Sequence, residues 1–257
     1  MPRFAANLAY LFTERPFLER FGAAAAAGFT AVELQFPYEE AASAVKAQLD
    51  RHNLTMLGIN TPPGRREAGE FGLAAVPGRE ADFALLFRQA LDYVRAIGGR
   101  QIHCLAGKVK PEARPAADTT FVHNLASAAD LALPHKVNLL IEPINSRDRP
   151  DYFLSRAEHA ADIVARLARA NVRIQFDFYH AQVMGGDLIR RFEKFLPAIG
   201  HAQIAAVPSR HEPDEGEVNY PAIYAMLDRL GYAGFVSCEY NPRGRTEDGL
   251  GWMREWL

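Results

Sequence analysis

Short apolar runs alternate with helical patterns along the 257 residues of this chain, and this alternation predicts an α/β fold, a single (β/α)8 TIM barrel. The length suits one barrel domain over residues 1–257, and a hydrophobic content of 49% is enough for a sizeable core. A doubly wound open sheet is disfavoured, because the chain has neither a G-x-G-x-x-G loop after its first strand nor a G-x-x-x-x-G-K-[ST] loop.

The elements follow from apolar runs for strands and from 3.6-residue periodicity for helices. Gly28 follows the first helix, at the position where a left-handed cap favours glycine. Ser155 and Glu158 have the spacing of a capping box at the start of the fifth helix. In chain order, the expected strands are Phe4–Leu8, Ala31–Phe36, Leu54–Asn60, Gln101–Leu105, Val137–Glu142, Val172–Asp177, Gly200–Ile204 and Gly234–Glu239. The expected helices are Pro16–Ala27, Tyr38–Arg51, Arg79–Ile97, Asp118–Ala132, Ser155–Ala170, Gly186–Leu196, Tyr220–Leu230 and Thr246–Leu257.

One long segment, residues 61–78, interrupts the rhythm of strands and helices. It is rich in glycine, proline and charge. Loops of this length in compact domains are more often functional lids or binding loops than simple connections. We therefore expect a lid here, although the segment could instead contribute to a subunit interface.

Composition excludes several classes of protein. The 29 Lys and Arg residues nearly balance the 31 Asp and Glu residues, which argues against a nucleic-acid-binding surface. Cys104 and Cys238 both lie in apolar runs and are expected to be reduced core thiols. The N-terminal residues lack the apolar core of a signal peptide, and no apolar run is long enough to cross a membrane. We expect a soluble, cytoplasmic protein with no membrane partner.

Polar side chains lie at or near the ends of the last four expected strands: Glu142, Asp177, Gln203 and Glu239. In a barrel, the C-terminal ends of the strands carry the functional loops, so these side chains should converge at one rim. Three carboxylates this close would repel one another, and a shared divalent cation lets all three ionise. Ligation by oxygen alone favours Mg²⁺ or Mn²⁺ over zinc. The sequence predicts a metal site made by these four residues.

With these motifs in place, the chain resembles the hydroxypyruvate isomerase family, within the wider group of xylose-isomerase-like barrels that includes the ketose 3-epimerases. The family's metal ligands correspond to Glu142, Asp177, Gln203 and Glu239, and its two acid/base glutamates correspond to Glu142 and Glu239. The motifs that carry the resemblance are Arg3-Phe4-Ala5-Ala6-Asn7-Leu8, Val32-Glu33-Leu34-Gln35-Phe36-Pro37-Tyr38, Ala68-Gly69-Glu70, Pro77-Gly78-Arg79-Glu80, Ile141-Glu142-Pro143-Ile144-Asn145, Asp177-Phe178-Tyr179-His180, Gly216-Glu217-Val218-Asn219-Tyr220 and Cys238-Glu239-Tyr240.

The resemblance implies a metal-dependent isomerase that interconverts hydroxypyruvate and tartronate semialdehyde. One glutamate would remove a proton from C3 and the other would return one to C2, through an enediolate; a hydride shift stays open. The adjacent basic lid residues Arg65 and Arg66 favour a more acidic or longer substrate, so 2-oxo-tetronate, a phosphorylated sugar or another short sugar acid or ketose is the alternative. A small-molecule sugar acid is the expected partner, and a homo-oligomer stays open.

Five further residues are candidates for binding the substrate. Arg210 and Lys108 could pair with its carboxylate. By analogy with the epimerases, His180 and Asp148 would contact substrate oxygens, and Glu70 would close over the ligand from the lid.

Two other classes of function remain to be compared. An endonuclease-type phosphodiesterase on this barrel would need several zinc ions and more histidine ligands than eight scattered histidines provide. A sugar-acid binding protein without catalysis would not need the paired glutamates.

Overall fold

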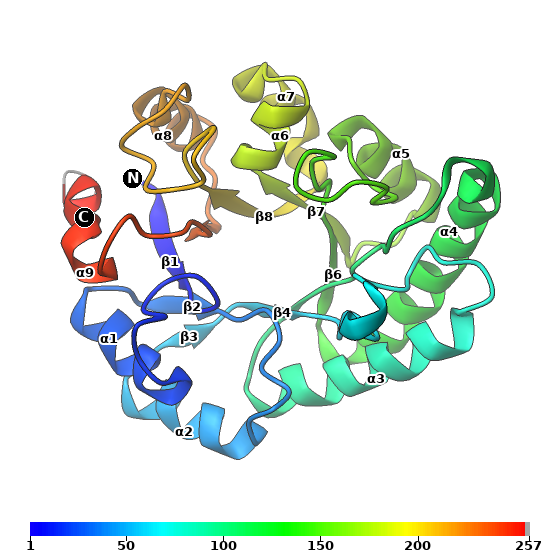
Figure 1. The fold of residues 1–257 in the computed structure, drawn as a ribbon, viewed down its shortest axis with the longest axis horizontal. Coiled ribbons are helices and arrows are strands. Elements are labelled where there is room, and N and C mark those ends of the chain that lie inside the picture. The colour runs from blue at the N-terminus through cyan, green and yellow to red at the C-terminus, as the bar shows by residue number, and fades with distance from the viewer. Residues whose placement is uncertain (255–257) are drawn as a thin grey trace.

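The computed structural model describes residues 1–254, which form a nearly closed barrel of parallel strands ringed by helices (Figure 1). The strands are β1 (Arg3–Asn7), β2 (Ala31–Glu33), β3 (Thr55–Met56), β4 (Gly58–Asn60), β5 (Gln101–His103), β6 (Asn138–Ile141), β7 (Val172–Asp177), β8 (Ile199–Ile204) and β9 (Phe235–Cys238). The α-helices are α1 (Arg20–Ala26), α2 (Ala42–Arg51), α3 (Glu80–Ala96), α4 (Arg114–Ala132), α5 (Ala157–Leu167), α6 (Phe178–Met184), α7 (Leu188–Phe195), α8 (Tyr220–Arg229) and α9 (Thr246–Gly249).

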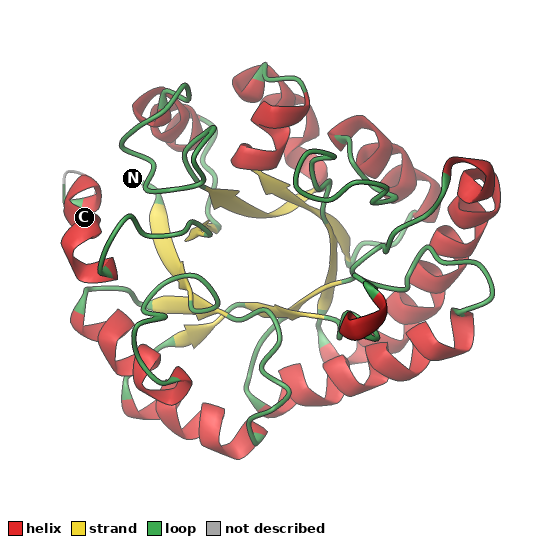
Figure 2. Ribbon diagram, in the orientation of Figure 1, coloured by secondary structure: helices red, strands yellow, loops and turns green. Residues whose placement is uncertain are grey.

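The predicted barrel is confirmed, and its nine strand segments correspond to the eight expected strands. Hydrogen bonding gives the order β3-β2-β1-β9-β8-β7-β6-β5-β4, so the two segments at the ends of this list are halves of the expected strand over 54–60. Leu57 lies between the halves and joins both neighbours: its N–H donates to the carbonyl of Val32, and its own carbonyl accepts from the N–H of Arg100. The sheet therefore runs almost completely around the axis (Figure 2).

Two expectations about helices are wrong. The fifth helix begins at Ala157, and no side chain caps it, so the capping box of Ser155 and Glu158 does not form. Just before this helix, the carbonyl of Leu154 accepts the N–H of Ile144. In addition, α6 follows β7 without a loop, where no helix was expected. The last expected helix is observed as α9 and the 3-10 turn η6 (Leu250–Met253), and its residues 255–257 lie outside the described part of the chain.

Amphipathic helices cover the barrel because their apolar residues recur on one face. In α3, Phe83, Phe87, Leu91 and Val94 are buried at the spacing of successive helical turns. Gly28 follows the C-cap residue of α1 and has φ +96°, the left-handed conformation predicted for this position. The result is one continuous core between the sheet and the helices.

Cys104 and Cys238 are free and buried, as predicted. Within residues 1–254, no helix combines the length and the apolar character needed to cross a bilayer.

Segment 61–78 is held against the barrel rather than extended from it. It contains a single 3-10 turn, η2 (Arg66–Ala68). The N–H groups of Ala74 and Ala75 donate to the carbonyls of Leu105 and Ala106, in the loop after β5. The segment thus lies beside the C-terminal end of β5, next to the rim where the predicted site residues converge.

Close packing between β4 and β5 yields a test of the fold. Gly58→Ala is expected to lower the free energy of unfolding by about 1–3 kcal/mol, because the added Cβ would lie 2.8 Å from both the Cβ and the carbonyl oxygen of Gln101. Urea-induced unfolding measures this loss. Gly244→Ala is the matched control, since nothing lies within 4 Å of its added Cβ. Equal effects in the two variants would contradict the packing explanation.

Candidate active site

The last four strands bring the predicted ligands to one end of the barrel. Glu142 directly follows β6, Asp177 ends β7, Gln203 lies next to last in β8, and Glu239 directly follows β9. A register shift between β7 and β8 places Asp177 opposite Gln203 across the ladder. All four side chains are buried. The arrangement follows from the parallel sheet, in which every strand ends at the same rim.

A cavity of about 340 Å³ opens above these strand ends, and Glu142, His180, Arg210 and Glu239 line it. A larger hollow of about 820 Å³ lies elsewhere, between α1, α2 and the segment around α9. The smaller cavity is the better candidate for the active site, because it holds convergent carboxylates with shifted pKa values.

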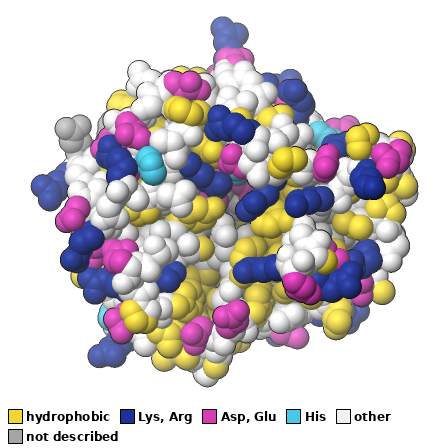
Figure 3. Space-filling view, in the orientation of Figure 1, with side chains coloured by type: hydrophobic (Ala, Val, Ile, Leu, Met, Phe, Trp, Pro, Cys, Tyr) yellow, Lys and Arg dark blue, Asp and Glu magenta, His cyan; other side chains and the backbone are white. Residues whose placement is uncertain are grey.

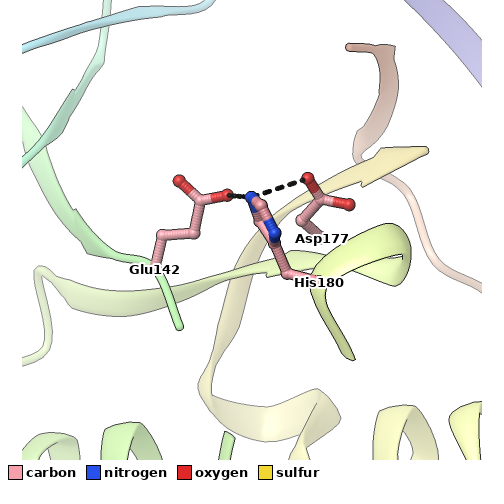
Figure 4. Close-up of side chains that lie close together, drawn as sticks. All are labelled: Glu142, Asp177 and His180. Carbon is pink, nitrogen blue, oxygen red and sulfur yellow. Dashed lines mark ion pairs between the residues drawn. The ribbon is translucent and has the colours of Figure 1, made fainter. Parts of the chain in front are cut away.

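Three side-chain atoms converge at the floor of the site (Figure 4). His180 Nε2 lies 3.6 Å from Glu142 Oε1 and 3.7 Å from Asp177 Oδ2. The three atoms lie within 4.8 Å of one another, and among residues 1–254 this is the group of acidic, histidine or cysteine side chains that could hold a metal ion.

Two of these atoms are oxygens that lack a hydrogen-bond partner, and a bound cation would provide a partner for both. Glu142 Oε1 and Asp177 Oδ2 are buried, and within the described chain neither accepts a hydrogen bond. A buried acceptor without a partner costs about 1–3 kcal/mol, and more when it is charged. Mg²⁺ and Mn²⁺ prefer oxygen ligands of this kind. The residues present therefore fit a divalent cation.

The hydrogen bonds of Asn145 determine which nitrogen of His180 carries the hydrogen. The backbone N–H of Asp148 donates to Asn145 Oδ1 at 2.8 Å, so the amide nitrogen of Asn145 is the atom that lies 2.6 Å from His180 Nδ1. An amide nitrogen can only donate, so Nδ1 accepts, and the hydrogen of the neutral ring is assigned to Nε2. Burial lowers the pKa of His180 well below its usual value, which keeps the ring neutral. In this tautomer Nε2 is a hydrogen-bond donor and not a metal ligand.

Two side-chain amides in series connect the two glutamates. Gln175 Nε2 donates to Glu142 Oε2 at 3.0 Å and to Gln203 Oε1 at 2.8 Å. Gln203 Nε2 donates in turn to Glu239 Oε2 and to Glu33 Oε1, both at 2.7 Å. The amides fix the relative positions of Glu142 and Glu239. The oxygen of Gln203, which the sequence predicts as a metal ligand, faces Gln175.

Glu239 is fully paired, unlike Glu142. Arg210 Nη2 lies 2.7 Å from Glu239 Oε1, and Asn7 Nδ2 donates to Glu239 Oε2 at 2.9 Å. The guanidinium carbon of Arg210 lies 4.9 Å from the centre of the Tyr179 ring, which holds it over the site.

Burial and mutual repulsion raise the pKa values of the carboxyl groups at the site. Burial, reinforced by Glu239 and Asp177, raises the pKa of Glu142 well above its ordinary value. Burial also raises the pKa of Glu239 to about 8 and that of Asp177 to about 6, although Arg210 lowers both. Neighbouring carboxyl groups with raised, mutually dependent pKa values allow one to hold a proton while another is ionised, as an acid/base pair requires.

Three of the five predicted substrate-binding residues lie in or beside the cavity. His180 and Arg210 line it. Asp148 lies next to Arg210, with 3.7 Å between its Oδ2 and Arg210 Nη1, and the hydroxyl of Tyr179 donates to it at 2.8 Å.

The other two predicted residues, Glu70 and Lys108, are not among those that line the cavity. Glu70 Oε1 lies 2.6 Å from Arg79 Nη1 and 3.2 Å from Arg65 Nη2. Its carboxylate is therefore already paired with two arginines. Lys108 is exposed and its backbone forms an antiparallel bridge with Tyr152. Their proposed contact with substrate gains no support from this geometry.

Several residues that shape the site were not singled out from the sequence. Glu33, like Glu142, is a carboxylate at the end of an apolar strand, and this position could have identified it from the sequence. In the structure its Oε2 lies 2.6 Å from His201 Nε2. His103 ends β5, and its Nδ1 lies 3.3 Å from Glu142 Oε2. Gln175 could have been found by alternation, because it lies two residues before Asp177 and so shares its face of β7.

The model of the family described as "Xylose isomerase-like TIM barrel" matches residues 21–256. The chain belongs to the xylose isomerase-like TIM barrel family.

Named relatives cover the whole chain. A 2-oxo-tetronate isomerase from Cupriavidus necator is 49% identical over 100% of this chain and 99% of the relative. The hydroxypyruvate isomerase of Escherichia coli is 40% identical over 98% of each chain. With relatives of this kind over the full length, the chain is an isomerase of the hydroxypyruvate or 2-oxo-tetronate type.

Solved structures support the same fold. A crystal structure from Brucella melitensis, described as an AP endonuclease of family 2, has a TM-score of 0.98 and 49% identity, covering 100% of this chain and 99% of that one. The 3-keto-D-glucoside 4-epimerase of Escherichia coli has a TM-score of 0.85 and 18% identity, over 99% of this chain and 100% of that one, and it bears on the fold alone.

The raised pKa values predict how the metal-free protein responds to pH. A carboxyl group with a raised pKa in the folded state binds its proton more tightly than the unfolded chain does. Its contribution to stability is present below its ordinary pKa and is lost as pH rises through the folded value. For Asp177 and Glu239 these folded values are about 6 and about 8.

We therefore expect the melting temperature, measured by circular dichroism in the presence of a chelator, to fall between about pH 7 and about pH 8.5. In this window Glu239 still loses its proton, whereas the buried histidines His103 and His180 are neutral in both the folded and the unfolded chain. Glu239→Gln should flatten this dependence because an amide does not titrate. A melting temperature that rises across the window would contradict the expectation.

Proposed function

We propose that this chain is a divalent-metal-dependent isomerase of short 2-oxo sugar acids, with 2-oxo-tetronate as its preferred substrate and hydroxypyruvate as a smaller one. The observation that carries the proposal is the pair Glu142 and Glu239, which lines one cavity and is connected by the hydrogen bonds of two side-chain amides. Beside this pair lie buried carboxylate oxygens that have no hydrogen-bond partner in the described chain. The preference for the four-carbon acid is supported by the order of identities, since relatives named 2-oxo-tetronate isomerase reach 49% and 47%.

Glu142, Asp177, Gln203 and Glu239 would hold the ion, as the sequence predicts. A divalent ion in this place supplies Lewis-acid polarisation of the carbonyl and hydroxyl oxygens of the substrate. Gln203 Oε1 now accepts from Gln175, so its use as a ligand would require that bond to be released.

The two glutamates would carry the proton transfer. One removes the proton from C3 of the 2-oxo acid, which gives an enediolate across C2 and C3, and the other delivers a proton to C2. The hydroxyl proton on O3 leaves as that oxygen becomes the new carbonyl, and O2 gains one. Nothing is oxidised overall. The Nε2 hydrogen of His180, held by Asn145, would donate to a substrate oxygen and steady the developing negative charge.

The alternatives are less well supported by these residues. An endonuclease would need a cluster of zinc ligands, but His201 is taken up by Glu33, and the group with metal geometry within residues 1–254 contains a single histidine. A binding protein without catalysis would not need two facing glutamates whose pKa values are both raised.

Turnover assays with the wild-type protein test the proposal directly. Conversion of 2-oxo-tetronate should stop after chelation and return with Mg²⁺ or Mn²⁺, because the substrate oxygens then regain their polarisation. In D₂O, proton transfer should place deuterium at C2, whereas a hydride shift would not. Full activity after verified metal removal would overturn the mechanism, and inactivity toward both 2-oxo-tetronate and hydroxypyruvate would overturn the substrate assignment.

Two variants should separate metal binding from proton transfer. Glu142→Gln is expected to lose both metal affinity and turnover, because one side chain serves both. His180→Gln should retain metal affinity, measured by calorimetry, while kcat falls about 10²- to 10⁴-fold. Loss of metal affinity in His180→Gln would show that its Nε2 is a ligand after all, and an unchanged Glu142→Gln would remove the basis of the site.

A further inference from the structure

Two arginines at the mouth of the active-site cavity have no part in the chemistry described so far. Arg66 comes from η2 in the lid, and Arg149 comes from the loop after β6; both line the cavity that Glu142 and Glu239 line. Figure 3 shows Lys and Arg side chains gathered around the hollow at the centre of this face.

Each of these guanidinium groups rests on an aromatic ring that also lines the cavity. The guanidinium carbon of Arg66 lies 4.5 Å from the centre of the Phe36 ring, and that of Arg149 lies 4.4 Å from the centre of the Phe71 ring. Stacking of this kind limits the rotation of a long side chain without neutralising its charge. Both groups are therefore partly ordered before any ligand arrives.

Neither arginine forms an ion pair with a carboxylate of residues 1–254, in contrast to the other arginines nearby. Arg210 lies 2.7 Å from Glu239, and Arg65, the neighbour of Arg66, lies 3.2 Å from Glu70. The charges of Arg66 and Arg149 are thus available to an anion in the cavity. A carboxylate matches the planar fork of a guanidinium and can accept two parallel hydrogen bonds from it.

We propose that Arg66 and Arg149 bind the carboxylate of the substrate, and so select 2-oxo acids over uncharged ketoses of the same length. This inference rests on the proposed function for its substrate class. The carboxylate is anchored at the cavity mouth while C2 and C3 lie toward Glu142 and Glu239. Arg210, whose charge is shared with Glu239 and Asp148, steadies the acid/base pair instead.

Binding of unreactive ligands tests the proposal apart from catalysis. Erythronate carries the carboxylate and erythritol is its uncharged counterpart. In Arg66→Gln and Arg149→Gln, the dissociation constant for erythronate, measured by calorimetry, should rise about 10- to 100-fold, while that for erythritol stays the same. With 2-oxo-tetronate, KM should rise by a similar factor and kcat should change little.

Arg65→Gln is the matched control, because it removes the same charge from the same lid without removing a residue that lines the cavity. It should leave erythronate binding unchanged. An equal effect in Arg65→Gln, or an equal loss of erythritol binding in the Arg66 and Arg149 variants, would overturn the proposal. So would a wild-type preference for erythritol 4-phosphate over erythronate that depends on the two arginines, since this would indicate a phosphate site. If the wild-type protein fails to isomerise 2-oxo acids yet binds erythronate through these arginines, the proposed function fails and the acid site stands.

Discussion

Mutual repulsion among four carboxylates in the interior of one small barrel is the constraint on which the site depends. Burying charges of one sign together costs several kcal/mol for each ion unless partners compensate it. Partners are supplied unevenly. His201 pairs with Glu33, and Arg210 pairs with Glu239, whereas Glu142 and Asp177 each keep one oxygen without a partner in the described chain. The uncompensated charge is therefore localised, and it marks the place where a cation would fit.

The consequence for the carboxyl groups can be seen in their pKa values. Burial alone would raise the pKa of Glu33, but His201 and the hydrogen bond from Gln203 outweigh it and lower that pKa. Burial prevails at Glu142, and its pKa rises. Similar residues thus differ within one barrel, because the surroundings of Glu33 favour its ionised form and those of Glu142 favour its protonated form.

In both Asp177 and Glu142, one carboxylate oxygen accepts a hydrogen bond from the protein and the other has no hydrogen-bond partner in the described chain. Oδ1 of Asp177 accepts the N–H of Tyr179 and caps α6, which leaves Oδ2 pointing into the site. Glu142 uses Oε2 to accept from Gln175 and leaves Oε1 free. Since one oxygen fixes the side chain, the other is presented in a defined direction.

Much of the barrel could be predicted from the sequence, because apolar runs and helical periodicity are local signals. The strand ends at Glu142, Asp177, Gln203 and Glu239 were predictable for the same reason, since each polar residue lies at or near the end of an apolar run. The helix α6 could not be found this way, because it begins directly after Asp177, the last residue of β7, with no connecting loop between them. The amide series through Gln175 depends on a register shift between β7 and β8, which no local pattern shows. Arg66 and Arg149 line the same cavity although they lie more than eighty residues apart in the sequence, so no local pattern could bring them together.

Segment 61–78 carries Arg66 on a short turn that ends at Gly69, whose φ of +73° favours glycine. This turn is separate from the strands that carry the carboxylates. Loops on such barrels change sequence more freely than the strands do. The proposed carboxylate recognition and the proposed proton transfer thus depend on different parts of the chain. If both proposals hold, a descendant of this protein could acquire a new class of substrate through a few replacements in these loops while keeping the same reaction.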